Sequence, residues 1–168
     1  MGKNSENKDG KMMQERFIEI VVYLLQELKR PGVKGNYSNI SKKLLARGYT
    51  ENEINFAFSW VFNHMAENHM PREEDIEYST RSVRLLHEVE KMVIQPEAYG
   101  YLLQLRELGL LDDYEFEMVV EKALSLGTSH VTIDDIKSIA GTIIFGNEIN
   151  SQGSWDGFYY PFGSNSIQ

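Results

Sequence analysis

The sequence predicts an all-α protein of about seven helices, arranged as two small helical modules that pack together. Two observations favour this fold class. Apolar residues recur at spacings of three and four along most of the chain, which is the period of a helix with one buried face. Between such segments stand helix stop and start signals, a glycine followed by a capping residue, after Gly48 and again after Gly109.

The N-terminal module should cover residues 13–66 and contain three helices. Residues 1–12 are polar and lack aromatic side chains, so we expect them to be disordered. Pro31 stops the first helix, and Asn36 or Ser38 caps the second. The expected helices are residues 13–30, 39–47 and 51–66.

The turn before the third helix carries the strongest local signal in the chain. Gly48 fits the left-handed position just past a helix end. Thr50 and Glu53 have the spacing of a capping box, in which each side chain accepts a hydrogen bond from the other's backbone amide. Tyr49 and Ile54 occupy the positions of a hydrophobic staple. The segment therefore predicts a tight, oriented joint between two helices.

An acidic connector, residues 67–81, should lead to a C-terminal module over residues 82–146, and a flexible, aromatic-rich tail over residues 147–168 should follow. The expected helices of this module are residues 88–94, 96–108, 113–126 and 133–145. Capping pairs precede three of them: His87 with Glu90, Asp112 with Glu115, and Thr132 with Asp135.

The third helix, residues 51–66, is apolar around most of its circumference. We therefore expect it to be the central helix on which the others pack, with Trp60 in the core. Its position makes the N-terminal module helix-turn-helix-like. However, it begins Glu51-Asn52-Glu53 and contains no Lys or Arg, which argues against sequence-specific reading of DNA by this helix.

Composition excludes several classes of protein. The chain has 168 residues, a formal net charge of −8 and a pI near 5.0, so its overall charge does not favour nucleic acid. It has no Cys, which excludes disulfides and thiolate chemistry. No apolar run is long enough to span a membrane, and the first residues lack the apolar centre of a signal peptide. We expect a cytoplasmic protein.

No pattern indicates an enzyme, a metal or a cofactor. The four histidines (His64, His69, His87 and His130) never stand four apart on one helix, as zinc ligands would. The acidic pairs at helix starts are expected for capping. Phosphate-binding loops and nucleophile elbows are absent. The sequence predicts no catalytic, cofactor-binding or metal-binding residue.

Six of the 17 basic residues gather in one acid-free stretch, residues 29–47. Such a stretch could contact nucleic-acid phosphates, an acidic protein surface, or the chain's own acidic second half, or it could simply be solvated. The residues of this basic patch are Lys29, Arg30, Lys34, Lys42, Lys43 and Arg47.

Two further features suggest contacts. Arg84 lies between apolar residues, and we expect it to form a structural ion pair, with projection into a partner's site as the alternative. The tail could bind in a partner's groove or fold back on exposed apolar surface. Its aromatic residues are Trp155, Phe158, Tyr159, Tyr160 and Phe162.

Several stretches, in the same order along the chain, resemble the bacterial Smg family, whose function is uncharacterised. The resemblance covers about residues 13–146 and implies a small helical cytoplasmic protein without assigned catalytic residues. The stretches are the segment from Phe17 to Leu25, Leu44 to Tyr49 with the helix around Trp60, Ser82 to Leu86, Gly100 to Asp112, and Glu117 to Leu124 with Ile136-Lys137.

We therefore expect a non-enzymatic protein that acts through an unknown protein partner, as an interaction or regulatory protein. The alternative is a nucleic-acid-associated module that contacts phosphates through the basic patch. No feature of the sequence determines the oligomeric state.

Overall fold

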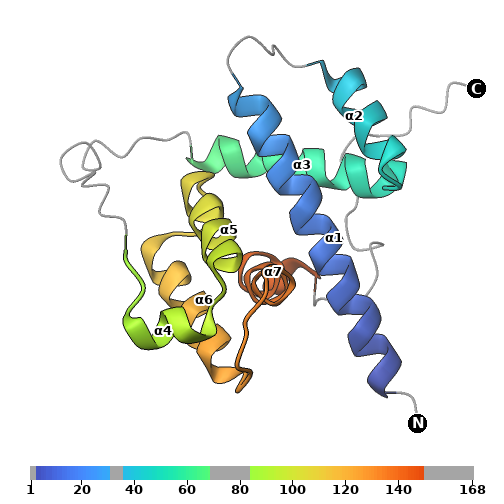
Figure 1. Ribbon diagram of the computed structural model, residues 1–168. Helices are drawn as coiled ribbons and strands as arrows, with labels where there is room; N and C mark the ends of the chain where they lie inside the picture. The colour runs from blue at the N-terminus through green and yellow to red at the C-terminus, as the bar shows by residue number, and fades with distance from the viewer. Residues whose placement is uncertain (1–2, 31–35, 69–83, 150–168) are drawn as a thin grey trace, which may run out of the picture.

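Seven helices make up the part of the chain that the computed structural model describes, residues 3–30, 36–68 and 84–149 (Figure 1). An isolated bridge between Ile94 and Val131 is the only β pairing within these ranges. The all-α prediction is confirmed. The helices are α1 (Lys3–Lys29), α2 (Tyr37–Ala46), α3 (Glu51–Asn68), α4 (Glu88–Val93), α5 (Pro96–Glu107), α6 (Asp113–Ser125) and α7 (Ile133–Ile149).

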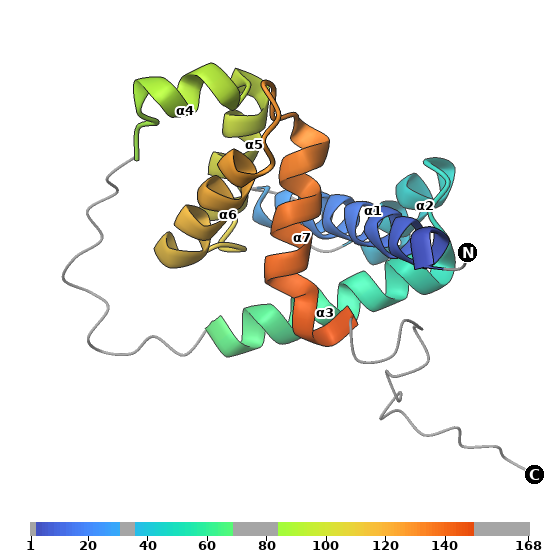
Figure 2. The same cartoon turned by 90° about the horizontal axis from the view of Figure 1, so that it is seen from below.

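The first and last helices cross at the centre of the molecule, as Figures 1 and 2 show. α7 packs against α1, α5 and α6, whereas α3 packs mainly against α1 and α2. The expectation that α3 is the central helix is therefore wrong. Its apolar circumference does not mean burial on every side, because the Phe62 side chain remains 57% exposed. The two sets of helices, α1–α3 and α4–α7, share one continuous core.

Three aromatic rings join the two sets of helices at this centre. The Phe17 ring of α1 lies 4.7 Å from the Phe145 ring of α7, and the Trp60 ring of α3 lies 5.0 Å from Phe145. All three side chains are buried, as predicted for Trp60. Edge-to-face pairs of this kind contribute about 0.5–1.5 kcal/mol each beyond the burial of their area. The α1–α3–α7 contact is therefore a main source of stability.

The helix ends follow the local signals closely. Gly48 has a φ of 88° and Gly109 a φ of 79°, the left-handed conformation that glycine adopts without strain. The amide of Thr50 donates to the Glu53 carboxylate at 2.7 Å, and the amide of Glu53 donates to the Thr50 hydroxyl at 3.3 Å. Equivalent reciprocal bonds join Asp112 to Glu115 and Thr132 to Asp135.

α1 is longer than expected. It begins at Lys3, so residues 3–12, predicted to be disordered, are helical. Once a helix is nucleated, each added residue gains a hydrogen bond at low cost, and Lys, Glu, Gln and Met favour the helical state. The polar composition of residues 3–12 therefore shows where the buried apolar stripe of α1 begins, near Met13. It does not show where the helix itself begins. The connector over residues 69–81 and the tail from residue 150 onward lie outside the described residues.

Candidate functional site

The structure divides the predicted basic patch between two places. Lys29, at the end of α1, donates to the backbone carbonyl of Glu107 on α5 at 3.0 Å. Arg30, just after the end of α1, pairs with Glu27 of α1 at 3.4 Å. These two cations therefore serve contacts within the protein. Lys34 lies outside the described residues.

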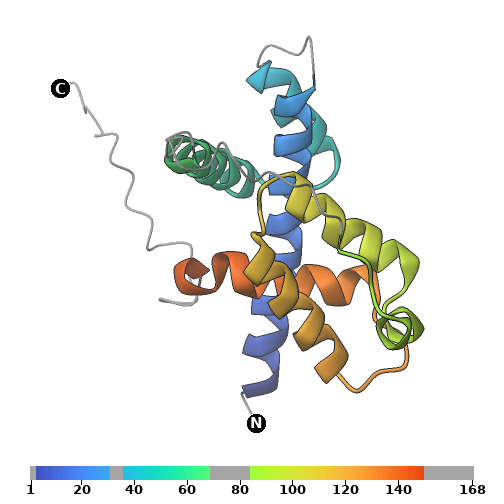
Figure 3. The ribbon, with the colours of Figure 1, turned by 90° about the vertical axis from the view of Figure 1, so that its left-hand side faces the viewer.

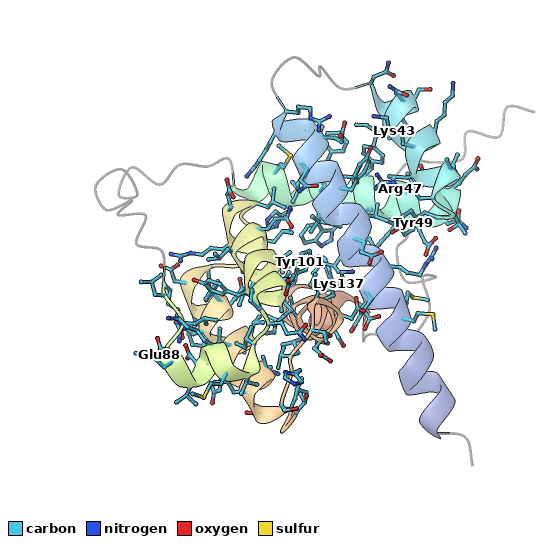
Figure 4. The ribbon with its side chains drawn as sticks, in the orientation of Figure 1. Lys43, Arg47, Tyr49, Glu88, Tyr101 and Lys137 are labelled. Atoms are coloured by element: carbon cyan, nitrogen blue, oxygen red, sulfur yellow. The ribbon has the colours of Figure 1, made fainter. Side chains whose placement is uncertain are left out.

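The remaining cations of the patch belong to α2 and the turn that follows it, as Figure 4 shows for Lys43 and Arg47. The guanidinium of Arg47 lies 4.4 Å from the centre of the Tyr23 ring on α1, a cation–π contact. Lys42 and Lys43 are exposed, and neither makes an ion pair with any residue that the structure describes. Among the cations of the patch that the structure describes, Lys42 and Lys43 of α2 are therefore the two without an ion pair, a backbone hydrogen bond or a ring contact.

Arg84 is held by carboxylates on two elements. Its guanidinium donates two hydrogen bonds of 2.9 Å to Glu90 of α4 and also pairs with Glu117 of α6. Glu90 is buried and accepts a further bond of 2.7 Å from the His87 amide as the capping partner. The Arg84 guanidinium holds the pKa of the Glu90 carboxyl below its usual range, with the His87 bond adding to the effect. The predicted structural ion pair is confirmed.

Exposed apolar side chains lie next to Arg84 and Glu90 in the chain and one turn before Glu117 on α6. Val89 and Met92 lie three residues apart on α4, and their side chains are 70% and 76% exposed. Leu85, just before α4, is 74% exposed. Tyr114, 73% exposed, precedes Glu117 by about one turn of α6, and the Arg84–Glu117 pair brings Leu85 near that turn. We call Leu85, Val89, Met92 and Tyr114 the α4 surface.

A polar cluster that the sequence did not reveal joins the Gly48 turn to α1 and α7. Glu19 of α1 accepts a hydrogen bond of 2.7 Å from the Tyr49 hydroxyl and one of 2.6 Å from Lys137 of α7. One turn earlier, Arg16 binds Glu53 at 2.8 and 3.1 Å and donates to the Gly48 carbonyl at 3.0 Å. We call Arg16, Glu19, Tyr49, Glu53 and Lys137 the Glu19 cluster.

The cluster alters the ionisation of its members. Hydrogen bonds from Arg16, assisted by the Thr50 amide and hydroxyl, lower the pKa of Glu53 to about 2. Burial, together with the hydrogen bond to Glu19, raises the pKa of Tyr49 to about 12. Burial lowers the pKa of Lys137, but the hydrogen bonds and charges of Glu19 and Asp134 together outweigh it, and the net change is upward. Glu53, its cation Arg16, and Lys137 therefore remain charged at neutral pH.

Tyr101 of α5 lies at the edge of the cluster, with the Lys137 amine 6.0 Å from its ring centre (Figure 4). Its hydroxyl is buried and has no hydrogen-bond partner among the described residues. Burial raises the pKa of Tyr101 strongly, and the Glu19 charge adds to the rise. A buried hydroxyl without a partner is energetically costly.

Of the histidines that the structure describes, His64 and His87 make structural contacts. A ring nitrogen of His64 lies 3.1 Å from the Gly109 carbonyl, and its ring stacks on Trp60 at 4.7 Å. His87 caps α4, and His130 is exposed in the loop before α7. His69 lies outside the described residues, as do the five aromatic residues of the tail. Within the described ranges, no three acidic or histidine side chains gather as a metal site would require.

The cluster, apart from Arg16, and the turn it holds lie within the part of the chain that a protein-family profile matches. A profile of the family described as "Protein of unknown function (DUF494)" matches residues 17–155. This span is most of the chain. The chain belongs to the Smg family. Among its members, "Protein Smg homolog" from Methylobacillus flagellatus is 24% identical over 121 residues, covering 72% of this chain and 79% of the relative.

Two further members show the same extent of similarity. The Smg homolog of Stenotrophomonas maltophilia is 24% identical over 145 residues, which cover 85% of this chain and 90% of the relative. That of Xylella fastidiosa is 26% identical over 139 residues, covering 79% and 84%. No solved structure matches. None of the helices in the described ranges has the length and apolarity that crossing a membrane requires.

Proposed function

We propose that this Smg-family protein is a non-enzymatic cytoplasmic interaction or regulatory protein whose partner covers the α4 surface. The observation that carries the proposal is the exposure of four large apolar side chains, each at least 70% exposed, on α4, just before it, and on the turn of α6 that the Arg84–Glu117 pair ties to this region. Exposed apolar groups gathered in one place are typical of protein-binding surfaces.

The surroundings of these side chains suit an interface. Glu88 and Lys91 flank Val89 and Met92 on α4 and pair with one another at 2.9 Å, which resembles the polar rim around an apolar interface centre. The Arg84 ion pairs with Glu90 and Glu117 fix the backbone beneath the surface. A rigid apolar surface loses little entropy when a partner binds.

The test places a photo-crosslinking residue at position 92 in living cells and identifies the protein captured. That protein is then purified, and its binding is measured with the native chain and with a Val89→Asp/Met92→Asp variant. We expect the double change to weaken binding about tenfold or more, because burial of each side chain contributes more than 1.4 kcal/mol. Leu126→Asp, an exposed apolar residue at the end of α6, is the matched control and should bind normally.

Binding that survives the double change, or no specific capture at position 92, contradicts the proposal. Circular dichroism of each variant distinguishes lost binding from lost folding. Because both changed side chains are mostly exposed, we expect the stability of the double variant to stay close to that of the native chain.

The second candidate function is contact with nucleic-acid phosphates through α2. It is favoured by Lys42 and Lys43, which are exposed, lie on a helix without acidic residues, and make no ion pair with the described residues. Affinity for single- and double-stranded oligonucleotides at low salt should fall when both become Glu, whereas Lys122→Glu on α6 should change it little. Absence of binding at low salt would exclude this function.

A further inference from the structure

A row of aromatic rings lies where α2 and α3 meet, away from the α4 surface. The Tyr37 ring lies 4.3 Å from the Phe58 ring, and the Phe58 ring stacks on Phe62 at 6.3 Å. The Tyr37 hydroxyl donates to the Asn55 side chain at 2.7 Å, which fixes the first ring. Phe58 is buried beneath its neighbours, whereas Tyr37 and Phe62 are 47% and 57% exposed. We call Tyr37, Phe58 and Phe62 the aromatic row.

Two residues of the row, Phe58 and Phe62, lie on a stretch of α3 that carries no charge. From Asn55 to Ala66, α3 contains no Lys, Arg, Asp or Glu, although a quarter of the chain is charged. Solvated helix faces normally carry such residues, and an exposed apolar row without them favours an apolar cover. A nucleic acid or a highly charged protein segment would find no charged partner on this stretch of α3.

The end of α7 brings the tail within reach of this row. The Phe145 ring of α7 contacts the Trp60 ring of α3, and Figures 2 and 3 show the C-terminal end of α7 on the same side of the molecule as α3. The eight residues that follow Ile149 can span up to about 26–29 Å when extended. An α-helix with its side chains is only about 10–12 Å across, so this lead can pass around α3.

The tail has the uncharged, aromatic composition that would suit a cover for the aromatic row. From Gly157 to Gln168 it contains no charged residue, and four aromatic side chains fall between Phe158 and Phe162. We propose that residues 157–162 lie along the aromatic row, covering Tyr37 and Phe62 within the same molecule. The family profile ends at residue 155, so this contact is a property of the chain beyond its family match.

Chymotrypsin tests the proposal, because it cleaves after the aromatic residues that would be covered. The rate of tail cleavage in the intact protein is followed by mass spectrometry and compared with that of a synthetic peptide of residues 150–168. We expect cleavage in the protein to be about tenfold slower or more, since burial of two aromatic rings favours the covered state by more than that factor. Phe62→Asp should abolish the protection, and Met92→Asp on α4 should retain it.

Acrylamide quenching of Trp155 fluorescence gives a second measurement that needs no protease. The Trp155→Phe variant measures the fluorescence of Trp60 alone, which is then subtracted. Trp155 should be quenched more in Phe62→Asp than in the native chain. Cleavage of the tail as fast as in the peptide overturns the proposal and leaves the aromatic row for another partner. Protection that persists in Phe62→Asp also overturns it. Protection that is lost on dilution overturns it too, because the tail would then bind a second copy of the chain. Protection that is independent of concentration and lost only in Phe62→Asp supports it.

Discussion

Replacement of Glu53 by Gln tests the ionic half of the Glu19 cluster. Gln keeps the size of Glu and can still accept the Thr50 amide bond of the capping box, so the change removes mainly the charge. The Glu53 side chain is only 16% exposed, and both of its carboxylate oxygens accept hydrogen bonds from Arg16. The substitution removes the anionic partner of Arg16, which keeps its hydrogen bond to the Gly48 carbonyl.

The structure sets the size of the effect. The pKa of Glu53 falls from an ordinary 4.5 to about 2, and each unit of pKa difference corresponds to about 1.4 kcal/mol. This gives an upper limit of about 3 kcal/mol. Because the Arg16 side chain is 39% exposed, solvent screens the pair, and we expect a loss of about 1–2 kcal/mol at pH 7.

The loss should depend on pH in a defined direction. The folded-state pKa lies below the unfolded value, so the stabilisation by Glu53 is fully present above about pH 4.5 and disappears as the pH falls toward 2. Urea unfolding of both proteins at pH 7, 5 and 3 measures this. Glu51→Gln, an exposed acid on the same helical turn, controls for the helix dipole. A difference that stays constant from pH 7 to 3, or is below about 0.3 kcal/mol at pH 7, would refute the reasoning.

Four further substitutions test other contacts by the same unfolding measurement. Thr50→Ala removes the cap of α3 and should cost about 1 kcal/mol; a change of only a few tenths would show that the cap is dispensable. Gly48→Ala places its methyl group in open space, so we expect a loss of about 1 kcal/mol in stability from the φ of 88° alone. An unchanged stability would contradict this. Arg84→Met leaves Glu90 buried without its cation and should cost about 2 kcal/mol, with Glu90→Gln added to the same chain recovering part of it. Tyr101→Phe removes a buried hydroxyl without a partner and should stabilise the protein by up to about 1 kcal/mol; a clear loss would indicate a bound water on that hydroxyl.

The local features of the fold could be predicted because their causes lie within a few residues. A glycine at φ 88° and the Thr50–Glu53 bonds depend only on the turn itself. The same holds for Asp112 and Glu115 at the start of α6. The helix boundaries accordingly agree with the sequence to within a few residues, apart from the start of α1 and the end of α7.

The packing could not be predicted in the same way. An apolar helix face is consistent both with burial and with an exposed binding surface, and α3 has both, with Trp60 inside and Phe62 outside. Only the arrangement of α1 against α7 decides which helix is central.

The Glu19 cluster was missed for a related reason. Glu19 and Lys137 are 118 residues apart, and a single Glu between two isoleucines gives no sign of its partner. Tyr49 was assigned only to a staple with Ile54, whereas its hydroxyl binds Glu19. The ion pair of Arg84 could be predicted because apolar residues flank the arginine, and its partner Glu90 lies only six residues further along the chain.

The crossing of α1 and α7 has a consequence for how the protein is made. During translation α1 is synthesised first and α7 last of the seven helices. Phe17 and Trp60 therefore cannot pack against Phe145 until nearly the whole chain has been synthesised. Contacts between distant parts of a sequence form late and slowly, and apolar surface exposed in the interval is prone to aggregate. Chains released before α7 should therefore depend on chaperones, and completion of the last helix should coincide with acquisition of protease resistance by the first.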